Sequence, residues 1–231
     1  MKGAIIGVKG NWAHFKKPET NNNPLTHDFI TKTAFVGLVG AVLGIERAEM
    51  RPLFPQLTED FCYGVEIVRA VKKESWSFKM RYATNLFKKR PVQMEFLKNP
   101  NFKVALALVN SRSEKWFDDF VRAVRDSEAC FTPVLGLHNC PAELALEATG
   151  DFSEMPEGKF STNAFITSEN HKITDLSQTE NFRVGFEKIP TFQEDFWSQR
   201  YKPIIYPSEG RSLTADGKHF RFADDSNWVL I

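Results

Sequence analysis

The stretch that decides the fold is residues 10–45, which read GNWAHFKKPETNNNPLTHDFITKTAFVGLVGAVLGI. Its first half interleaves aromatic, basic and amide side chains and holds few aliphatic ones, which is typical of an exposed loop. Its second half places small and bulky apolar residues at helical spacing, which predicts a buried helix. Because residues 2–10 alternate like a strand ahead of this stretch, the chain begins with strand, loop and helix.

Three glycines in the predicted helix indicate how closely it packs against its neighbour. Gly37, Gly40 and Gly44 share one face at helical spacing. A glycine inside a helix costs roughly 1 kcal/mol relative to alanine. We therefore expect another stretch of backbone to lie close against this face.

Periodicity also predicts the elements further along the chain. Apolar and basic side chains alternate between residues 76 and 82, and a K-K-R-P run follows, which predicts a protruding hairpin. The remaining apolar or alternating segments predict an amphipathic helix between 111 and 124, and strands at 61–71, 102–109, 132–137 and 144–152.

The resulting order of strand, helix, strand, strand, helix and strand predicts an α+β, ferredoxin-like domain over residues 1–152. A thumb-like hairpin, at about residues 73–100, is inserted between its second and third strands. Short segments with turn signals, including Asp216-Gly217 as a hairpin turn, predict a small strand-rich C-terminal annex over residues 153–231.

Composition excludes several classes of protein. A chain of 231 residues with 42% hydrophobic residues can bury one core, or one core and an annex. Its three cysteines form no C-x-x-C pair, which fits reduced intracellular thiols and predicts neither metal nor cofactor. The longest apolar run, residues 34–45, is shorter than a membrane span, and residues 1–10 lack a signal-peptide pattern. We expect a cytoplasmic protein that does not contact the membrane.

The net charge of +1 conceals an uneven distribution. Residues 72–90 hold seven bases and one acid, whereas residues 126–158 hold seven acids and no Lys or Arg. A cluster of like charge can follow a phosphate backbone while the acidic part stays clear of it.

These features together predict contacts with single-stranded RNA. Aromatic and basic side chains on the loop can stack on bases and neutralise phosphates, and the helix start offers free N–H groups to a phosphate. The predicted RNA-binding residues are Lys9, Asn11, Trp12, His14, Phe15, Lys16, Lys17, Asn21, Asn22, Thr31, Lys32, Thr33, Lys79, Arg81, Asn85, Lys88, Lys89, Arg90, His138 and Asn139.

Each of these features also has a purely structural interpretation. Trp12 and Phe15 could fold back onto the core, and Thr31 could be an ordinary helix N-cap. Lysines on the hairpin could protect an exposed strand edge from aggregation. The run of Lys88 and its two basic neighbours exceeds what edge protection needs, so we favour the RNA clamp.

Two blocks of sequence resemble a known family. The first contains Phe15-Lys16, Leu25-Thr26, Lys32-Thr33-Ala34 and GLVGAVLG at residues 37–44. The second is TPVLGLHNCPAEL at residues 132–144. Together with FKVALALV at residues 102–109, they resemble the Cas five subunits of type I CRISPR Cascade complexes, within the RAMP superfamily, and most of all the type I-B-like branch.

The resemblance implies a RAMP/RRM-like fold and a non-catalytic subunit that holds the 5′ handle of the CRISPR RNA (crRNA). It implies contacts with the backbone subunit and with the large subunit that reads the protospacer-adjacent motif (PAM), and it allows contact with target DNA near the PAM. Processing in the I-B-like branch belongs to a separate nuclease.

Two alternatives differ in class from this interpretation. One is a metal-independent endoribonuclease that processes CRISPR repeat RNA, with His14 or His138 as base and Lys16 or Lys17 as cation. No motif supports these roles, so we predict no catalytic residue. The other is an unrelated ferredoxin-like metabolic domain with a coincidental loop.

Overall fold

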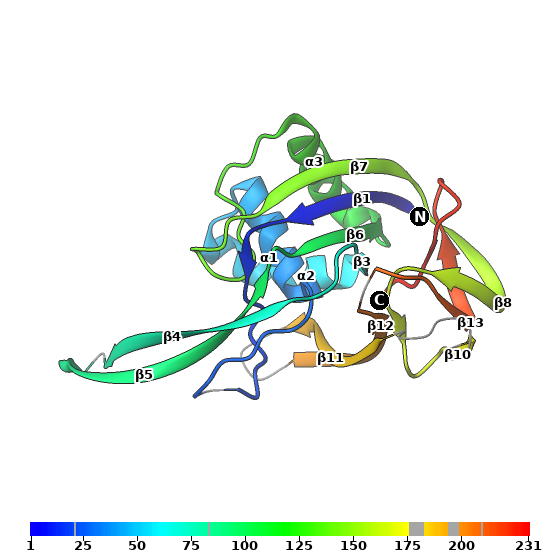
Figure 1. The fold of residues 1–231 in the computed structure, drawn as a ribbon. Helices are drawn as coiled ribbons and strands as arrows, with labels where there is room; N and C mark the ends of the chain where they lie inside the picture. Colours follow the sequence, from blue (N-terminus) through cyan, green and yellow to red (C-terminus); the bar gives the residue numbers. More distant parts are fainter. Residues whose placement is uncertain (21, 83, 176–182, 194–198, 209) are drawn as a thin grey trace.

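A four-stranded antiparallel sheet organises the chain, with strand order β3-β6-β1-β7. The structure is a computed structural model that describes residues 1–231 except 21, 83, 176–182, 194–198 and 209 (Figure 1). Four predicted strands form this sheet: β1 (Lys2–Lys9), β3 (Phe61–Ile67), β6 (Asn101–Leu108) and β7 (Glu143–Asp151). The predicted α+β class, with antiparallel sheets, is confirmed.

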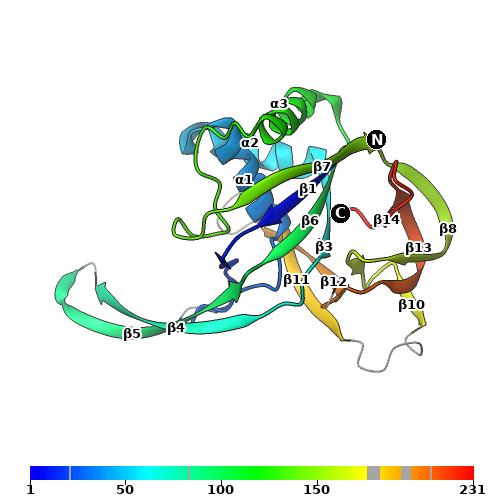
Figure 2. The ribbon, with the colours of Figure 1, turned by 45° about the horizontal axis from the view of Figure 1, so that its top comes forward.

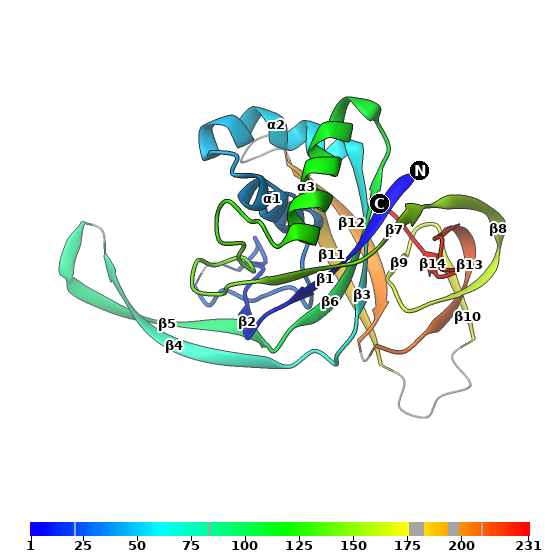
Figure 3. The same cartoon turned by 90° about the horizontal axis from the view of Figure 1, so that it is seen from above.

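The sheet is covered on both faces because its strands alternate two apolar sets of residues. Ile6 and its same-face neighbours pack beneath helices α1 (Lys32–Leu43) and α3 (Glu114–Asp126), which lie side by side (Figure 3). Ile5, on the opposite face, belongs to a cluster with Phe222 and Trp228 near the end of the chain. The N-terminal sheet therefore lies between these two helices and the last residues of the chain.

Helix α2 (Arg47–Asp60) was not predicted from the sequence. It contains Pro52 and Pro55, and proline normally breaks a helix interior because it lacks an N–H donor. Met50 of this helix packs over Gly40 of α1, while the space around Gly37 is open. The expected close approach of a second backbone is therefore wrong at Gly37 and Gly40, and is found only at the end of the helix, where Cys130 lies against Gly44 and its amide donates to the carbonyl of Val42 at 3.0 Å.

Replacing Gly37 with alanine is expected to stabilise the protein. Apart from the adjoining turns of α1 itself, no atom lies within 4 Å of the position that the new Cβ would take. Alanine lowers the conformational entropy of the unfolded chain, which should add about 0.5–1 kcal/mol to the free energy of unfolding. Thermal unfolding should show a melting temperature raised by roughly 1–4 °C. A lowered melting temperature would contradict the open surroundings of Gly37.

The predicted thumb is a long hairpin of β4 (Lys73–Tyr82) and β5 (Asn85–Lys98), which projects away from the body (Figure 1). Its root packs against β2 (Trp12–Ala13). There the ring centroids of Trp12 and Trp76 lie 4.4 Å apart, and those of Trp76 and Phe96 lie 4.9 Å apart. The aromatic contacts hold the root, whereas Phe87 at the tip is 95% exposed.

The C-terminal part is rich in strands, as predicted, and most of it lies on the side opposite the hairpin tip (Figure 2). One sheet pairs β13 (Leu213–Arg221) with β8 (Ser153–Thr162), β10 (Lys172–Asp175) and β14 (Asn227–Trp228). Another contains β12 (Gln199–Pro207) between β11 (Val184–Gln193) and β9 (Ile166–Thr167). The division of the chain after residue 152 stays a prediction.

Two predicted elements are wrong. Residues 132–137 form no strand, and within them only Val134 makes an isolated bridge, to Pro141, because Gly136 turns the chain with a φ of 88°. Asp216-Gly217 lies inside β13 and makes no hairpin turn. A register shift beside Gly217 disturbs the pairing with β8 there, so the glycine marks an irregularity in the strand.

None of the helices in the described part of the chain is long and apolar enough to cross a membrane.

Candidate nucleic-acid interface

The loop that follows β2 is a fixed structure built against the hairpin. His14 Nδ1 lies 2.7 Å from the carbonyl oxygen of Glu95, and the Thr26 amide donates to the Glu95 carboxylate at 3.1 Å. The Glu95 amide donates in turn to the carbonyl of Pro24 at 3.0 Å. Side-chain and backbone hydrogen bonds thus join the loop to β5, which fixes the direction in which the loop side chains point.

A groove of about 620 Å³ lies between this loop, the start of α1 and the hairpin. Its lining includes the thioethers of Met80 and Met94 and the turn at Gly136 and Leu137. Six predicted RNA-binding residues also line it: His14, Phe15, Lys16, Thr31, Thr33 and Arg90. Segments far apart in the sequence therefore meet around one apolar hollow with cations on its rim.

The start of α1 opens onto this groove. The Thr31 hydroxyl accepts a hydrogen bond from the Ala34 amide at 3.3 Å, so the N-cap interpretation of Thr31 is correct. The first turn contains no acidic residue. The positive end of the helix dipole, beside Thr31 and Thr33, is therefore available to an anion in the groove.

Five of the predicted cations on the loop and hairpin are exposed and are not neutralised by a carboxylate of the described residues. Within the part of the chain that the structure describes, these side chains have no carboxylate partner within 4 Å. They are Lys16, Lys79, Arg81, Lys88 and Lys89. Long cationic side chains without internal partners can reach a phosphate backbone and release its counterions.

The two aromatic residues of the loop pack against other aromatic rings. Phe15 is 3% exposed and packs on Phe102, with ring centroids 6.5 Å apart. Trp12 is half-buried against Trp76. Phe15 offers no open stacking surface because it is buried in the core, whereas the pairing of β2 with β5 turns Trp12 toward Trp76 and leaves it partly exposed, so RNA binding by Trp12 stays a prediction.

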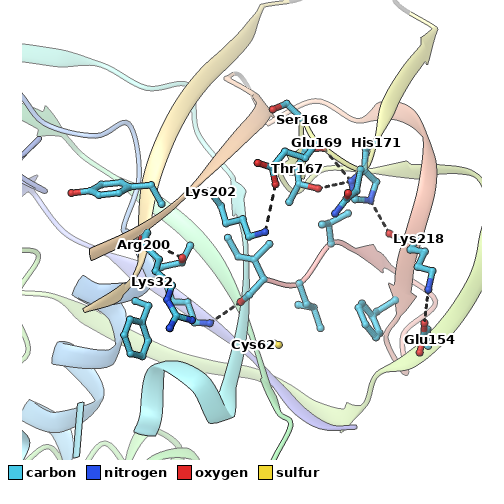
Figure 4. A pocket seen from close by; sticks show the side chains of 18 of the residues that line it. Lys32, Cys62, Glu154, Thr167, Ser168, Glu169, His171, Arg200, Lys202 and Lys218 are labelled. Atoms are coloured by element: carbon cyan, nitrogen blue, oxygen red, sulfur yellow. Dashed lines mark hydrogen bonds and ion pairs between the residues drawn. The ribbon is translucent and has the colours of Figure 1, made fainter. Parts of the chain in front are cut away.

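Lys32, which was predicted to bind RNA, is buried and does not face the groove. It is 6% exposed, its Nζ donates to the backbone oxygen of Ile231 at 3.0 Å, and burial lowers its pKa. It lines a different cavity, of about 1230 Å³, where Figure 4 shows it with Cys62 and Arg200. Successive helical residues point about 100° apart, so Lys32 faces away from the groove that Thr31 and Thr33 line.

His14 and Lys17 have internal partners. Burial lowers the pKa of His14, so its imidazole is neutral at neutral pH and adds no charge for a phosphate. Lys17 Nζ lies 2.7 Å from the carboxylate of Glu187 on β11, which also lies 2.8 Å from Nδ1 of His27. Glu187 and His27 were not predicted from the sequence, because no local pattern links side chains so distant along the chain.

The other predicted contacts that the structure describes do not line the groove. Lys9, Asn11 and Asn22 are exposed, as are His138 and Asn139 in the second sequence block. Asn85 holds the hairpin tip together, since its side-chain oxygen accepts from the amides of Phe87 and Lys88. Asn21 lies outside the described residues. A role in RNA binding stays a prediction for each of them.

Most of the chain, residues 5–202, matches the family profile described as CRISPR-associated protein (Cas_Cas5). The chain belongs to the Cas5 family. The resemblance that the two sequence blocks indicated is therefore confirmed, whereas the type I-B-like branch stays a prediction. No curated protein sequence matches this Cas5 protein significantly.

Two solved structures share the fold of this Cas5 protein. A CRISPR protein from Archaeoglobus fulgidus superposes with a TM-score of 0.61 and 13% identity, over 99% of this chain and 98% of that one. A chain described as "CRISPR RNA-guided surveillance complex" gives a TM-score of 0.54 and 13% identity, over 97% and 92%. At such low identity these matches establish the fold, and the function must be argued from the site.

Proposed function

We propose that this Cas5 protein is a non-catalytic, crRNA-binding subunit of a type I CRISPR Cascade complex and caps the 5′ handle of the crRNA. Lys16 and Arg90 bind handle phosphates at the rim of the groove, and the start of α1 binds a further phosphate. The cations of the hairpin follow the strand beyond the groove. Family membership supports the class of function, and the groove supports the location.

The observation that carries this proposal is the convergence of the loop, helix and hairpin on one groove. Lys16 and Arg90 come from segments about seventy residues apart, yet both border the same apolar hollow. A hollow with methionine walls and a cationic rim suits an unpaired nucleotide, whose base is apolar on its faces and whose phosphate is anionic.

The proposed protein partners are the large subunit that reads the PAM and the backbone subunit, with target DNA near the PAM as a further contact. Leu86 and Phe87 at the hairpin tip are 61% and 95% exposed, which supports a protein contact there. Exposed apolar side chains that gather at one place on a protein commonly mark an interaction site.

One observation favours the endoribonuclease as a second candidate. The groove places His14 together with Lys16 and Arg90, which are the base and cations that metal-independent RNA cleavage uses. One fact weighs against it. His14 is only 3% exposed, so a 2′-hydroxyl has little access to its imidazole, although Nδ1 donates to the Glu95 carbonyl and Nε2 is left unprotonated.

A single binding experiment separates these functions. The purified chain is mixed with a fluorescein-labelled single-stranded transcript of a CRISPR repeat, in EDTA, and anisotropy and denaturing gels are recorded. We expect binding that weakens steeply with salt and an RNA that stays intact. A discrete cleavage product would overturn the non-catalytic role. Absence of binding at physiological salt would overturn the RNA-binding function itself.

A further inference from the structure

A buried carboxylate on β11 holds the loop of the candidate interface from the side opposite the hairpin. Glu187 is 5% exposed at its side chain, with one oxygen 2.7 Å from Lys17 Nζ and the other 2.8 Å from His27 Nδ1. Although burial raises it, hydrogen bonds from His27 and Lys17 hold the pKa of Glu187 below its ordinary value. The carboxylate is therefore charged at neutral pH and attracts both partners.

A second contact between the loop and the C-terminal strands lies beside the first. The Tyr206 hydroxyl on β12 donates to Asp28 at 2.6 Å, and the other oxygen of Asp28 lies 2.6 Å from Lys73 Nζ at the hairpin root. The Tyr206 ring lies across Gly185 of β11, where any side chain larger than hydrogen would collide with it. The glycine thus provides the space in which the hydroxyl reaches Asp28.

We propose that Glu187, supported by Tyr206, is a positioning residue that fixes residues 15–20 and 22–29 in their RNA-binding conformation. The inference rests on the proposed function and extends it, because β11 and β12 then support the loop that contacts RNA. No atom of Glu187 needs to touch RNA. Its effect passes through Lys17 and His27, which it holds in place.

In this arrangement two neighbouring lysines have different roles. Lys17 is 23% exposed at its side chain and is neutralised by Glu187, whereas Lys16 borders the groove and has no carboxylate partner among the described residues. The ion pair of Lys17 fixes the loop, and the backbone of Lys17 also donates to Leu25 at 2.9 Å. Lys16 is the phosphate contact, and Lys17 is its support.

The test compares full-length variants by anisotropy with the fluorescein-labelled CRISPR-repeat transcript over a range of salt concentrations. Glu187→Gln and Lys17→Gln should each weaken binding about fivefold to tenfold at physiological salt. Lys17→Gln should leave the slope of log affinity against log salt unchanged, whereas Lys16→Gln should reduce it by about 0.7. Lys17→Arg, which keeps the ion pair, should restore wild-type affinity.

A matched control keeps the test specific. Glu169, in the turn after β9, carries an exposed carboxylate 3.5 Å from Lys202 of β12, so Glu169→Gln removes the same charge near these strands without touching the loop. Its affinity should equal that of the wild type. Melting temperatures are measured for all variants, and binding is compared at a temperature at which every variant is folded.

Two outcomes would overturn the proposal. One is wild-type affinity in Glu187→Gln, and the other is a slope reduced by Lys17→Gln as much as by Lys16→Gln, which would make Lys17 a direct contact. Hydrogen exchange of residues 15–29 tests the anchoring without RNA, and faster exchange confined to this loop in Glu187→Gln supports it. If the wild-type chain binds no transcript while that exchange result holds, the proposed function fails and the anchoring stands.

Discussion

Simultaneous replacement of Lys88, Lys89 and Arg90 by alanine is expected to cause the largest loss of RNA affinity. Each cation that releases a counterion from single-stranded RNA contributes about 0.7 to the slope of log affinity against log salt, so three contribute about 2. At about 0.15 M salt this corresponds to a loss on the order of 50-fold. Anisotropy titrations of the CRISPR-repeat transcript at several salt concentrations measure both quantities.

The matched control removes the same charge from a helix that does not border the groove. Lys115, Arg122 and Arg125 are exposed on α3, and their replacement by alanine should change neither slope nor affinity appreciably. Equal losses in the two triple variants would mean that only net charge matters. In that case the hairpin would have no special role as a clamp.

Gly136→Ala is expected to produce the largest structural effect. Gly136 has a φ of 88°, and a Cβ at this position would fall on the carbonyl of His14, whose amide donates to the carbonyl of Leu135 at 3.0 Å. Backbone strain and the displaced contact should cost roughly 3 kcal/mol, which lowers the melting temperature by roughly 6–12 °C. Affinity for RNA should fall at least tenfold because the loop on the groove wall moves.

Gly158→Ala is the control for this change. Gly158 lies in β8 with no positive φ and with open space around its missing Cβ. Its replacement should leave the free energy of unfolding within about 0.5 kcal/mol of the wild type. If thermal melts of the two variants coincide, the close approach of Gly136 to His14 is not a requirement of the fold.

The elements that could be predicted from the sequence are those whose pattern is local. Strand β1, the hairpin and α3 each repeat apolar residues at the period of their own structure. Helix α2 escaped prediction because Pro52 and Pro55 interrupt its pattern. Tertiary packing overrides local propensity there, since Met50 and Leu57 of α2 join the core.

The candidate site could be predicted only in part. Composition singled out Lys16 and Arg90, because clustered cations on exposed segments are visible in the sequence itself. The burial of Phe15 and Lys32 could not be read in this way, since exposure depends on which direction a loop or the first helical turn takes. Glu187 was not predicted because its partners lie in a distant part of the chain.

The anchoring of the loop also has a consequence for synthesis on the ribosome. Glu187 follows His27 by 160 residues, and Tyr206 follows Asp28 by 178. Synthesis proceeds at roughly 5–20 residues per second, so the loop that contains His27 and Asp28 is made on the order of ten seconds before these partners. The proposed RNA-binding conformation of this loop is therefore complete only after translation has passed Tyr206, and we expect this order to limit capture of RNA by unfinished chains.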